Sequence, residues 1–391
     1  DDESVDNNRI LIYLNKSIND KQKLQKIVIK VLDINKISYL ELKDMSLERI
    51  SGRILFHLKN LENFKMEKIK FKSIDPQLFD SVDHLNSLNI RDGSFEAISI
   101  LRLNESKCDF LISLDLFNNG IKYLDQRSFS KLFYLKFLHL GRNNIELIQP
   151  QTFKHLISLT YLNLHQNKIV SLGDFAFANL MKLENLIITD NKLEFIAEKA
   201  VNDLANLKNL LLGKNQLRSI SNVPINSFKL LKIVDLSQNP FDDLDFVFKS
   251  KESTSTSIDC INRKNGFELL LKEIKTNMSI DSISFGCFKN LEAFRLDSNR
   301  LSWINETKTF VIRLNDLVHL KYFELNNIYM RSFRTFELLS NPKVNIESIG
   351  FLFNMIDSID FVEFNGLNGL KKLIFTSNKI ASIENVTFKG V

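Results

Sequence analysis

A motif of 24 residues recurs in phase over residues 111–244. One copy places Leu135, Leu138 and Leu140 ahead of Asn143, and further apolar residues follow at fixed spacing. The same columns begin at residues 111, 159, 183, 207 and 231, each a step of 24 residues from the next copy. Because several columns stay in phase, composition alone does not explain the pattern. A repeat of this length predicts a solenoid of stacked coils.

The alternation within each copy predicts a short strand followed by a turn. In Leu138-His139-Leu140 a period of two sends the leucines inward and His139 outward. Asn143 follows where the chain must turn, and an asparagine side chain can satisfy backbone groups that a buried turn leaves unpaired. We expect a structural ladder of such residues, which comprises Asn119, Asn143, Asn167, Asn191, Asn215, Asn239, Asn299, Asn354 and Asn378.

The repeat divides the chain into four predicted segments. Residues 1–36 are polar and form a cap-like N-terminal segment, which a solenoid needs because its terminal coil exposes a core edge. Residues 37–248 form a first repeat block that begins with degenerate copies. Residues 249–287 are irregular, and residues 288–391 form a second block that we interpret as truncated at its C-terminus.

The irregular segment opens with the polar run Lys249–Ser257. Apolar residues then recur with helical spacing at Phe267, Leu270, Leu271 and Ile274, which predicts a short amphipathic helix. The segment is interpreted either as a degenerate cap or as a looped-out insertion.

The 24-residue copies resemble the "typical" class of leucine-rich repeat, because many of them carry a late phenylalanine. These residues are Phe79, Phe129, Phe153, Phe177, Phe364 and Phe388. The resemblance implies an α/β fold, a curved horseshoe solenoid with a parallel β-sheet on its concave face and mostly irregular or short helical convex segments. Toll-like receptor ectodomains, chaoptin-like adhesion proteins and Slit-like secreted proteins share this class.

The resemblance implies a protein-binding recognition module. The leading interpretation is the extracellular, cell-surface part of a receptor-like glycoprotein, acting in ligand binding, cell adhesion or signal transduction. The alternative is a cytoplasmic leucine-rich repeat scaffold or regulatory subunit, which the cysteine-poor ends permit. Because the chain opens with Asp1 and not with methionine, we interpret it as a segment of a longer protein. A membrane association is therefore expected only through flanking segments.

The predicted contact surface is the outward face of the strands. There we expect a continuous apolar and aromatic band with two histidines beside it, and such exposed bands usually contact something. The candidate residues are Phe117, Phe137, His139, Tyr161, His165, Ile187, Leu211 and Ile233. The partner is expected to be a protein ligand or another copy of the chain. The competing interpretation is that strand propensity alone favours these residues on a sheet surface.

Composition and motifs argue against other classes of function. The charge of +5, from 52 basic and 47 acidic residues, is slight for the size, so no nucleic acid is expected as a partner. Neither a metal-ligand or nucleophile motif around the histidines nor a glycine-rich phosphate loop is present. We therefore predict no enzyme activity, no cofactor and no metal site. No apolar run reaches 18 residues.

Two kinds of modification are considered from the sequence. Candidate N-glycosylation sites are Asn15, Asn104, Asn277, Asn305 and Asn385. With so many asparagines, about five such sequons arise by chance, so they are weak support for an ectodomain. Cys260 and Cys287 flank the irregular segment and either form a disulfide or remain two thiols, whereas Cys108 is predicted to be a buried small residue.

Overall fold

The computed structural model forms two compact units. Unit 1 comprises Asp1–Leu186 with Lys199–Leu204, and unit 2 comprises Ile187–Glu198 with Ala205–Val391. The structure describes residues 9–13, 36–104, 108–220, 222–224, 228, 230–240, 267–272, 282–284, 291–297, 310–313, 319–327, 336–339, 344–360, 363–365, 367, 369–384 and 387–389.

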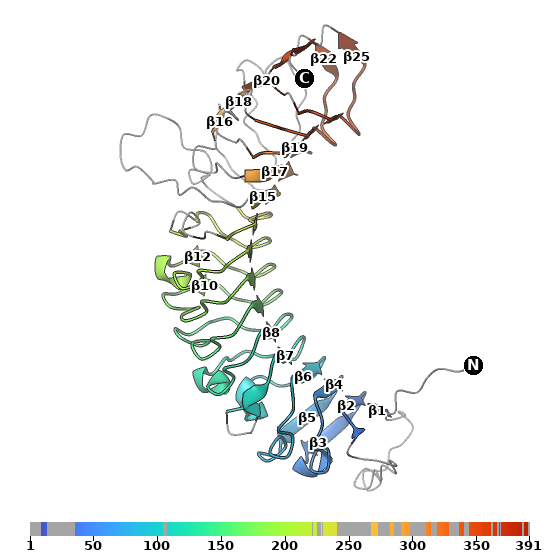
Figure 1. Cartoon of the computed structure of the whole chain (residues 1–391), viewed down its shortest axis with the longest axis vertical. Coiled ribbons are helices and arrows are strands. Elements are labelled where there is room, and N and C mark those ends of the chain that lie inside the picture. Colours follow the sequence, from blue (N-terminus) through green and yellow to red (C-terminus); the bar gives the residue numbers. More distant parts are fainter. Residues whose placement is uncertain are drawn as a thin grey trace, which may run out of the picture. The chain divides into compact units, whose positions relative to one another are not determined.

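The strands of unit 1 form a parallel sheet in the order β1-β2-β4-β6-β7-β8-β9 (Figure 1). Their bounds are Arg9–Tyr13, Tyr39–Lys43, Asn63–Glu67, Ser87–Arg91, Ser113–Asp115, Phe137–His139 and Tyr161–Asn163. Leu138 of β8 lies opposite Leu114 of β7 and Leu162 of β9, each 24 residues away. The sequence period is therefore the register of the sheet. Strand β1, within the segment predicted to be a cap, pairs in parallel with β2.

The return segments of unit 1 contain short elements. Strand β3 (Ser46–Ile50) pairs in parallel with β5 (Lys70–Ile74), a second strand layer that the sequence did not predict. The others are η3 (Gly52–Ile54), η4 (Ile98–Leu101), η5 (Cys108–Phe110), η6 (Gln126–Phe129) and β10 (Ser171–Leu172), with η7 (Glu198–Ala200) and β12 (Phe195–Ile196) next along the chain. Every helix among the described residues is a 3-10 turn, and none has the length and apolar character to cross a bilayer.

Unit 2 contains a parallel sheet in the order β11-β13-β14-β15-β17-β19-β21-β24. These strands are Asn185–Ile187, Asn209–Leu211, Ile233–Asp235, Phe267–Lys272, Leu291–Asp297, Tyr322–Asn326, Ser348–Gly350 and Lys372–Ile374. Smaller parallel sheets join β16 (Ser282–Ser284), β18 (Phe310–Arg313) and β20 (Phe336–Leu339), then β22 (Ser358–Asp360) with β25 (Ser382–Glu384), and β23 (Glu363–Asn365) with β26 (Thr387–Lys389).

The prediction of an amphipathic helix that begins at Phe267 is wrong. Residues Phe267–Lys272 form strand β15, which pairs in parallel with β14 on one side and β17 on the other. Leu269 lies opposite Val234 of β14 and Phe294 of β17, both in the central leucine column. The run of leucines fits a period of two as well as helical spacing, and backbone partners on both edges favour the strand. The irregular segment therefore contributes a strand to the parallel sheet.

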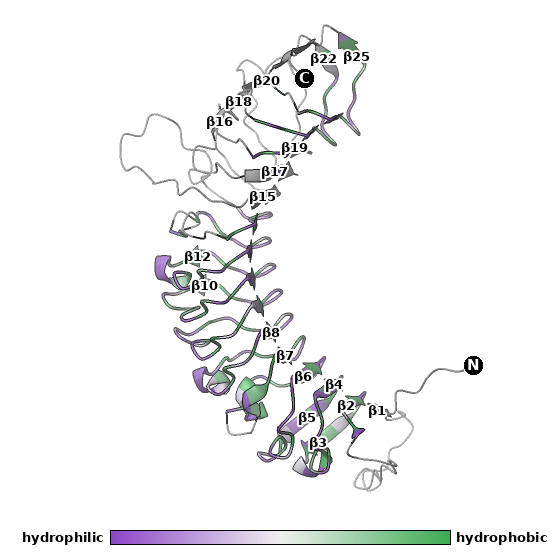
Figure 2. Ribbon diagram, viewed as in Figure 1, coloured by the Kyte–Doolittle hydropathy of each residue, from purple (hydrophilic) through white to green (hydrophobic). Residues whose placement is uncertain are grey.

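The core consists of the leucine columns and a row of phenylalanines. Leu135, Leu138 and Leu140 are fully buried, and so are Phe129 and Phe153. The rings of Phe129 and Phe153 lie 5.6 Å apart between centroids, so the late phenylalanine of one coil packs on that of the next. Apolar and hydrophilic residues alternate along the coils (Figure 2). Burial of one face per coil explains why coils must stack.

Asn143 shows how the turn after each strand is satisfied. Its Oδ1 accepts hydrogen bonds from the backbone N–H groups of Asn119 and Ile121, both at 3.0 Å. Its Nδ2 donates to the carbonyl oxygens of Leu116 and Leu140, both at 2.9 Å. One amide thus joins its own turn to the preceding coil.

The same role is filled at most positions of the predicted ladder. Buried members are Asn119, Asn143, Asn167, Asn191, Asn215, Asn239 and Asn354. Asn378 is partly exposed, and its Nδ2 donates to the carbonyl oxygen of Phe351 at 2.6 Å. Asn299 lies outside the described residues. The ladder therefore recurs in both units.

Replacing Asn143 by alanine is expected to destabilise the protein by about 1–3 kcal/mol, because buried backbone groups of two coils lose their partner. The exposed Lys168→Ala variant serves as control and is expected to stay within about 0.5 kcal/mol of the wild type. Urea denaturation of both variants measures the difference. Equal midpoints would show that the asparagine ladder does not stabilise the coils.

Candidate binding surface on the sheet

The sheet register sorts the outward side chains of unit 1 into three rows. In strands β7, β8 and β9, the first row holds Ser113, Phe137 and Tyr161, and the second holds Asp115, His139 and Asn163. The third row, just past the strands, holds Phe117, Gly141 and His165. Phe117 therefore lies in a different row from Phe137 and Tyr161, so the predicted band is not a single line of side chains.

Phe137 and Tyr161 form an aromatic stack on the first row. Their ring centroids are 4.7 Å apart with an angle of 9° between the planes, and both side chains are partly exposed. The Tyr161 hydroxyl accepts a hydrogen bond from Nδ2 of Asn163 at 3.2 Å. The adjacent leucines of both strands are buried in the core. This pair therefore presents aromatic surface to solvent from a rigid strand position.

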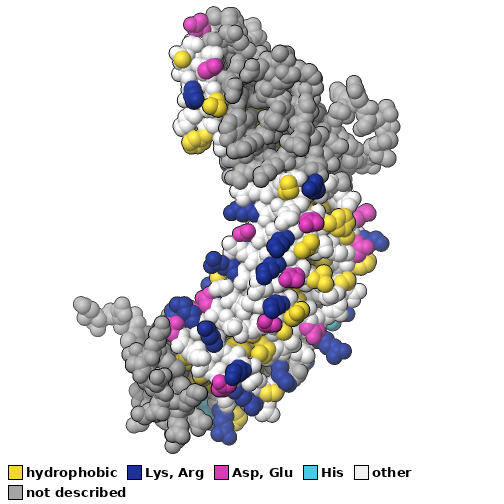
Figure 3. All heavy atoms as spheres, turned by 180° about the vertical axis from the view of Figure 1, so that it is seen from behind, with side chains coloured by type: hydrophobic (Ala, Val, Ile, Leu, Met, Phe, Trp, Pro, Cys, Tyr) yellow, Lys and Arg dark blue, Asp and Glu magenta, His cyan; other side chains and the backbone are white. Residues whose placement is uncertain are grey.

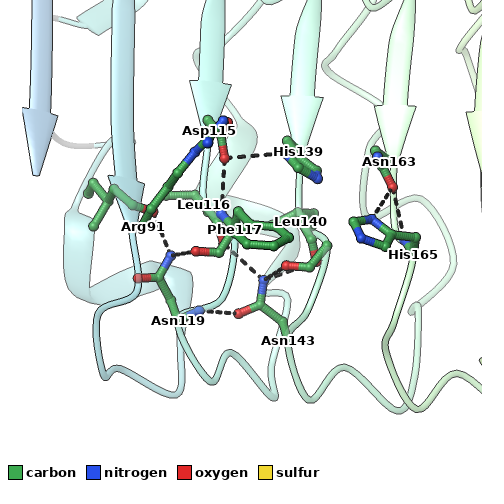
Figure 4. Close-up of polar contacts among 12 residues, drawn as sticks. Arg91, Asp115, Leu116, Phe117, Asn119, His139, Leu140, Asn143, Asn163 and His165 are labelled. Atoms are coloured by element: carbon green, nitrogen blue, oxygen red, sulfur yellow. Dashed lines mark hydrogen bonds and ion pairs between the residues drawn. The ribbon is translucent and has the colours of Figure 1, made fainter. Parts of the chain in front are cut away.

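Phe117 is instead the centre of a packed cluster (Figure 4). Its ring centroid lies 5.2 Å from that of His139 and 5.9 Å from that of His165. The guanidinium carbons of Arg91 and Arg142 each lie 5.8 Å from the ring centroid. Neighbours from three other coils thus surround Phe117, and the ring holds polar side chains in place.

Asp115 links the cluster to the strand before it. Its Oδ2 pairs with the guanidinium of Arg91, whose Nε donates at 3.0 Å. Burial on its own would raise the pKa of the Asp115 carboxyl, but hydrogen bonds from His139 and Arg91 hold that pKa below its ordinary value. Asp115 is therefore ionised at neutral pH and anchors both partners.

His139 faces Asp115 through Nδ1, which lies 3.4 Å from Oδ1 of the carboxylate. Because a carboxylate only accepts, we assign the ring proton to Nδ1. The other nitrogen, Nε2, is buried and has no hydrogen-bond partner among the described residues. The imidazole of His139 lies nearly parallel to that of His165, with centroids 5.6 Å apart.

Gly141 makes room for this histidine pair. A Cβ atom at Gly141 would lie 2.4 Å from the ring of His165 and 2.8 Å from Nε2 of His139. Oδ1 of Asn163 lies 2.9 Å from Nδ1 of His165, which also holds that ring in place. The absence of a side chain at residue 141 therefore decides where both imidazoles lie.

Charged side chains occupy the rows of β2 and β4. Lys65 Nζ lies 2.9 Å from Glu41 Oε1 and 2.8 Å from Glu67 Oε2, and Lys43 Nζ lies 2.9 Å from Glu67 Oε1. Hydrogen bonds from Lys65 and then Lys43 lower the pKa of Glu67 to about 2, and the two glutamates raise the pKa of Lys65. The carboxylates and ammonium groups on these strands therefore neutralise one another.

The three candidates in unit 2 are also partly exposed. Leu211 of β13 lies opposite Asp235 of β14, whereas Ile233 lies opposite Asn209. Leu211 and Ile233 therefore belong to different rows. Ile187, at the end of β11, is partly exposed as well. In this unit the predicted residues do not form one row either.

Sequence reasoning did not single out Arg91, Arg142 or Gly141 as members of the cluster. Asp115 is different, because the 24-residue step predicts it beside His139. The 26-residue step before Leu111 sets Asn89 of β6 opposite Asp115, so Arg91 reaches that carboxylate from two residues further along β6.

The remaining predicted sites are only partly described. Asn104 lies in a turn and its side chain is partly exposed, whereas Asn15, Asn277, Asn305 and Asn385 lie outside the described residues. Cys260 and Cys287 also lie outside them, and Cys108 is buried. In the part of the chain that the structure describes, no three metal-binding side chains come together.

Gly141→Ala is expected to displace both imidazoles, because the new methyl group would lie closer to their ring atoms than van der Waals contact allows. Nitrogen-detected NMR of the side chains should show shifted resonances for His139 and His165 and unchanged ones for His57 and His84. Gly173→Ala is the matched control, since nothing lies within 4 Å of its added Cβ. Unchanged imidazole resonances in Gly141→Ala would contradict the proposed packing.

Glu67 should make unit 1 more stable above pH 4.5 than near pH 2. A carboxyl with a lowered folded pKa stabilises the fold while ionised, and this contribution is lost as pH falls from about 4.5 towards 2. Glu67→Gln should flatten the dependence of the urea midpoint on pH in this window. Glu146→Gln, at an exposed position, should keep the wild-type slope. A wild-type slope in Glu67→Gln would show that the lysine pairs do not stabilise the fold.

The chain matches two family models of known repeat proteins. The family model described as "Leucine rich repeat" matches residues 110–169, 133–193, 158–217 and 181–241. The model described as "BspA type Leucine rich repeat region (6 copies)" matches residues 14–131. Together they extend over more than half of the chain. No curated protein sequence matches it significantly.

Solved structures show the same fold at low identity. A structure titled as a TLR13–ssRNA13 complex has a TM-score of 0.63 at 20% identity, covering 90% of this chain and 50% of that one. A Leptospira interrogans leucine-rich repeat protein has a TM-score of 0.63 at 17% identity, covering 95% and 85%. A complex of Latrophilin 3, Unc5D and FLRT2, named as containing a leucine-rich repeat, gives 0.50 at 15% identity, covering 76% and 77%.

The chain thus spans about half of the TLR13 chain that it resembles. The family matches, the 24-residue register and the asparagine ladder all agree on one architecture. The chain therefore belongs to the leucine-rich repeat family.

Proposed function

We propose that the chain is a recognition module that binds a protein ligand through the outward face of its sheet. The observation that carries the proposal is the Phe137–Tyr161 stack. Both rings lie on strands whose leucines are buried in the core. The core is therefore formed without the two rings. Aromatic side chains on a rigid surface are typical of binding hot spots.

The charges of unit 1 support a protein ligand over a nucleic acid. Binding to nucleic acid depends on basic side chains that neutralise phosphates. The lysines of β2 and β4 are already paired with glutamates, and Arg91 is paired with Asp115. On the face shown in Figure 3, basic side chains are interspersed with acidic and apolar ones. The structure titled as a TLR13 complex contains RNA, and the test below includes RNA for that reason.

The proposal extends to an extracellular receptor or adhesion role, with the cytoplasmic scaffold as the alternative. Two of the similar structures, which carry the names TLR13 and FLRT2, motivate it. The partly exposed side chain of Asn104, the first residue of a sequon, fits the same setting. No reaction is included in the proposal, since this family commonly supplies protein-interaction modules.

Phe137→Ala with Tyr161→Ala is expected to weaken ligand binding by about 2 kcal/mol or more. The loss of stability should be smaller, on the order of 0.5–1.5 kcal/mol, because only the exposed stack is removed. The ligand is first found by screening the whole chain against purified secreted and cell-surface proteins, with single-stranded RNA included. Binding of wild type and variant to it is then compared by calorimetry.

The matched control is Ile157→Ala, which removes an apolar side chain that is 50% exposed but lies outside the sheet rows. Its affinity should equal that of the wild type. Unchanged affinity in the Phe137, Tyr161 double variant would move the site away from the sheet. If RNA is the only molecule in the screen that binds, the proposal of a protein ligand is wrong.

An extracellular setting predicts that the protein isolated from its own cells carries a glycan on Asn104. Treatment with a glycosidase that converts a glycosylated asparagine to aspartate should shift the mass of the tryptic peptide containing that residue. The sequence flanking residues 1–391 should add a signal peptide. An unmodified Asn104, together with a full-length sequence that has no signal peptide, would favour the intracellular scaffold.

A further inference from the structure

Arg142 differs from the other cations on the sheet surface of unit 1. Lys43, Lys65 and Arg91 each lie within ion-pair distance of a carboxylate. Arg142 is exposed, and no carboxylate of the described residues in unit 1 lies within 4.0 Å of its guanidinium. Asp92, the acidic residue two coils earlier on the same edge, is hydrogen bonded to Asn118.

The position of Arg142 is fixed by its backbone and by Phe117. The residue has a φ of +54° in the turn after β8, and its N–H donates to the carbonyl oxygen of His165 at 2.9 Å. Its guanidinium carbon lies 5.8 Å from the Phe117 ring centroid. A contact with a ring face uses the plane of the guanidinium and leaves the N–H donors at its edge available.

A planar guanidinium with available N–H donors matches a carboxylate. The two groups form paired, charge-assisted hydrogen bonds of defined geometry. Because Asp115 neutralises Arg91, the charge of Arg142 is not balanced within the cluster. Arg142 lies in the turn that follows the strand carrying Phe137, so one ligand segment can contact the aromatic stack and the guanidinium together.

We propose that Arg142 receives a carboxylate of the protein ligand, held at a fixed position beside an apolar or aromatic contact with the Phe137–Tyr161 stack. This inference rests on the proposed function of the sheet surface. The carboxylate is either an Asp or Glu side chain or the C-terminus of the ligand. The two sources share the same chemistry and are separated by the test.

The test uses random peptide libraries, displayed with either a free or a blocked C-terminus, and selected on the whole chain. Wild-type protein should enrich peptides with an acidic residue at a constant distance from an aromatic residue. Arg142→Gln should select pools without that acidic preference. Enrichment in the free C-terminal library alone would identify the C-terminus as the source.

Affinities of one selected peptide then measure the contact. Arg142→Gln should weaken its binding about tenfold or more, as expected for a hydrogen bond to a charged group. A peptide with its acidic residue replaced by the amide should lose a similar factor with wild type and little more with Arg142→Gln. Lys168→Gln is the matched control, because it removes another exposed cation on a nearby turn, and should leave the affinity unchanged.

The outcomes separate this inference from the proposed function. Peptides that depend on Phe137 and Tyr161 but show no acidic preference would overturn the role of Arg142 and leave the binding surface in place. Peptides that bind equally well to the Phe137→Ala, Tyr161→Ala variant, or no selected peptides at all, would contradict both. As a control for folding, the urea midpoint of Arg142→Gln should equal that of the wild type. An equal midpoint would show that the variant has lost a contact with the peptide and not its stability.

Discussion

The asparagine amide buried in the turns of the ladder is the interaction on which the regular coils depend. The Asn143 side chain accepts hydrogen bonds from two backbone N–H groups of the preceding coil. It donates to carbonyl oxygens of that coil and of its own coil. A turn buried between neighbouring coils has no water to satisfy these groups, and each unpaired group costs about 1–3 kcal/mol. With the turn satisfied, the leucines can remain fully buried while the outward side chains are free to vary.

The outward side chains are organised by the sheet register. Strand neighbours 24 residues apart bring Phe137 onto Tyr161 and Asp115 beside His139. Most charges are neutralised within the surface, so its chemistry is aromatic and hydrogen bonding. Among the described residues of unit 1, Lys43, Lys65 and Arg91 are paired with carboxylates, whereas Arg142 lies against Phe117. Such a surface favours a ligand that is recognised by its shape and by one ion pair. It does not favour a ligand that is attracted by the electrostatic field of many like charges.

Two predictions show where periodicity loses information. The leucine run at residues 267–272 satisfies both helical and strand spacing, and only the backbone partners β14 and β17 decide for the strand. The expected apolar band treated Phe117 and Phe137 as equivalent, although they stand four residues apart in their repeats. Phe117 is consequently packed among His139, His165 and two arginines, while Phe137 remains available for contact.

The sequence by itself determined the coil, its 24-residue register, the buried leucines and the asparagine ladder, because these depend on local alternation and on a fixed period. Tertiary structure alone decided which polar groups meet across coils. Gly141 admits two imidazoles because the next coil places His165 beside it, and Arg91 reaches Asp115 although the register sets Asn89 opposite that carboxylate. Such contacts depend on distances between side chains of different coils, which a one-dimensional pattern of residue types does not contain.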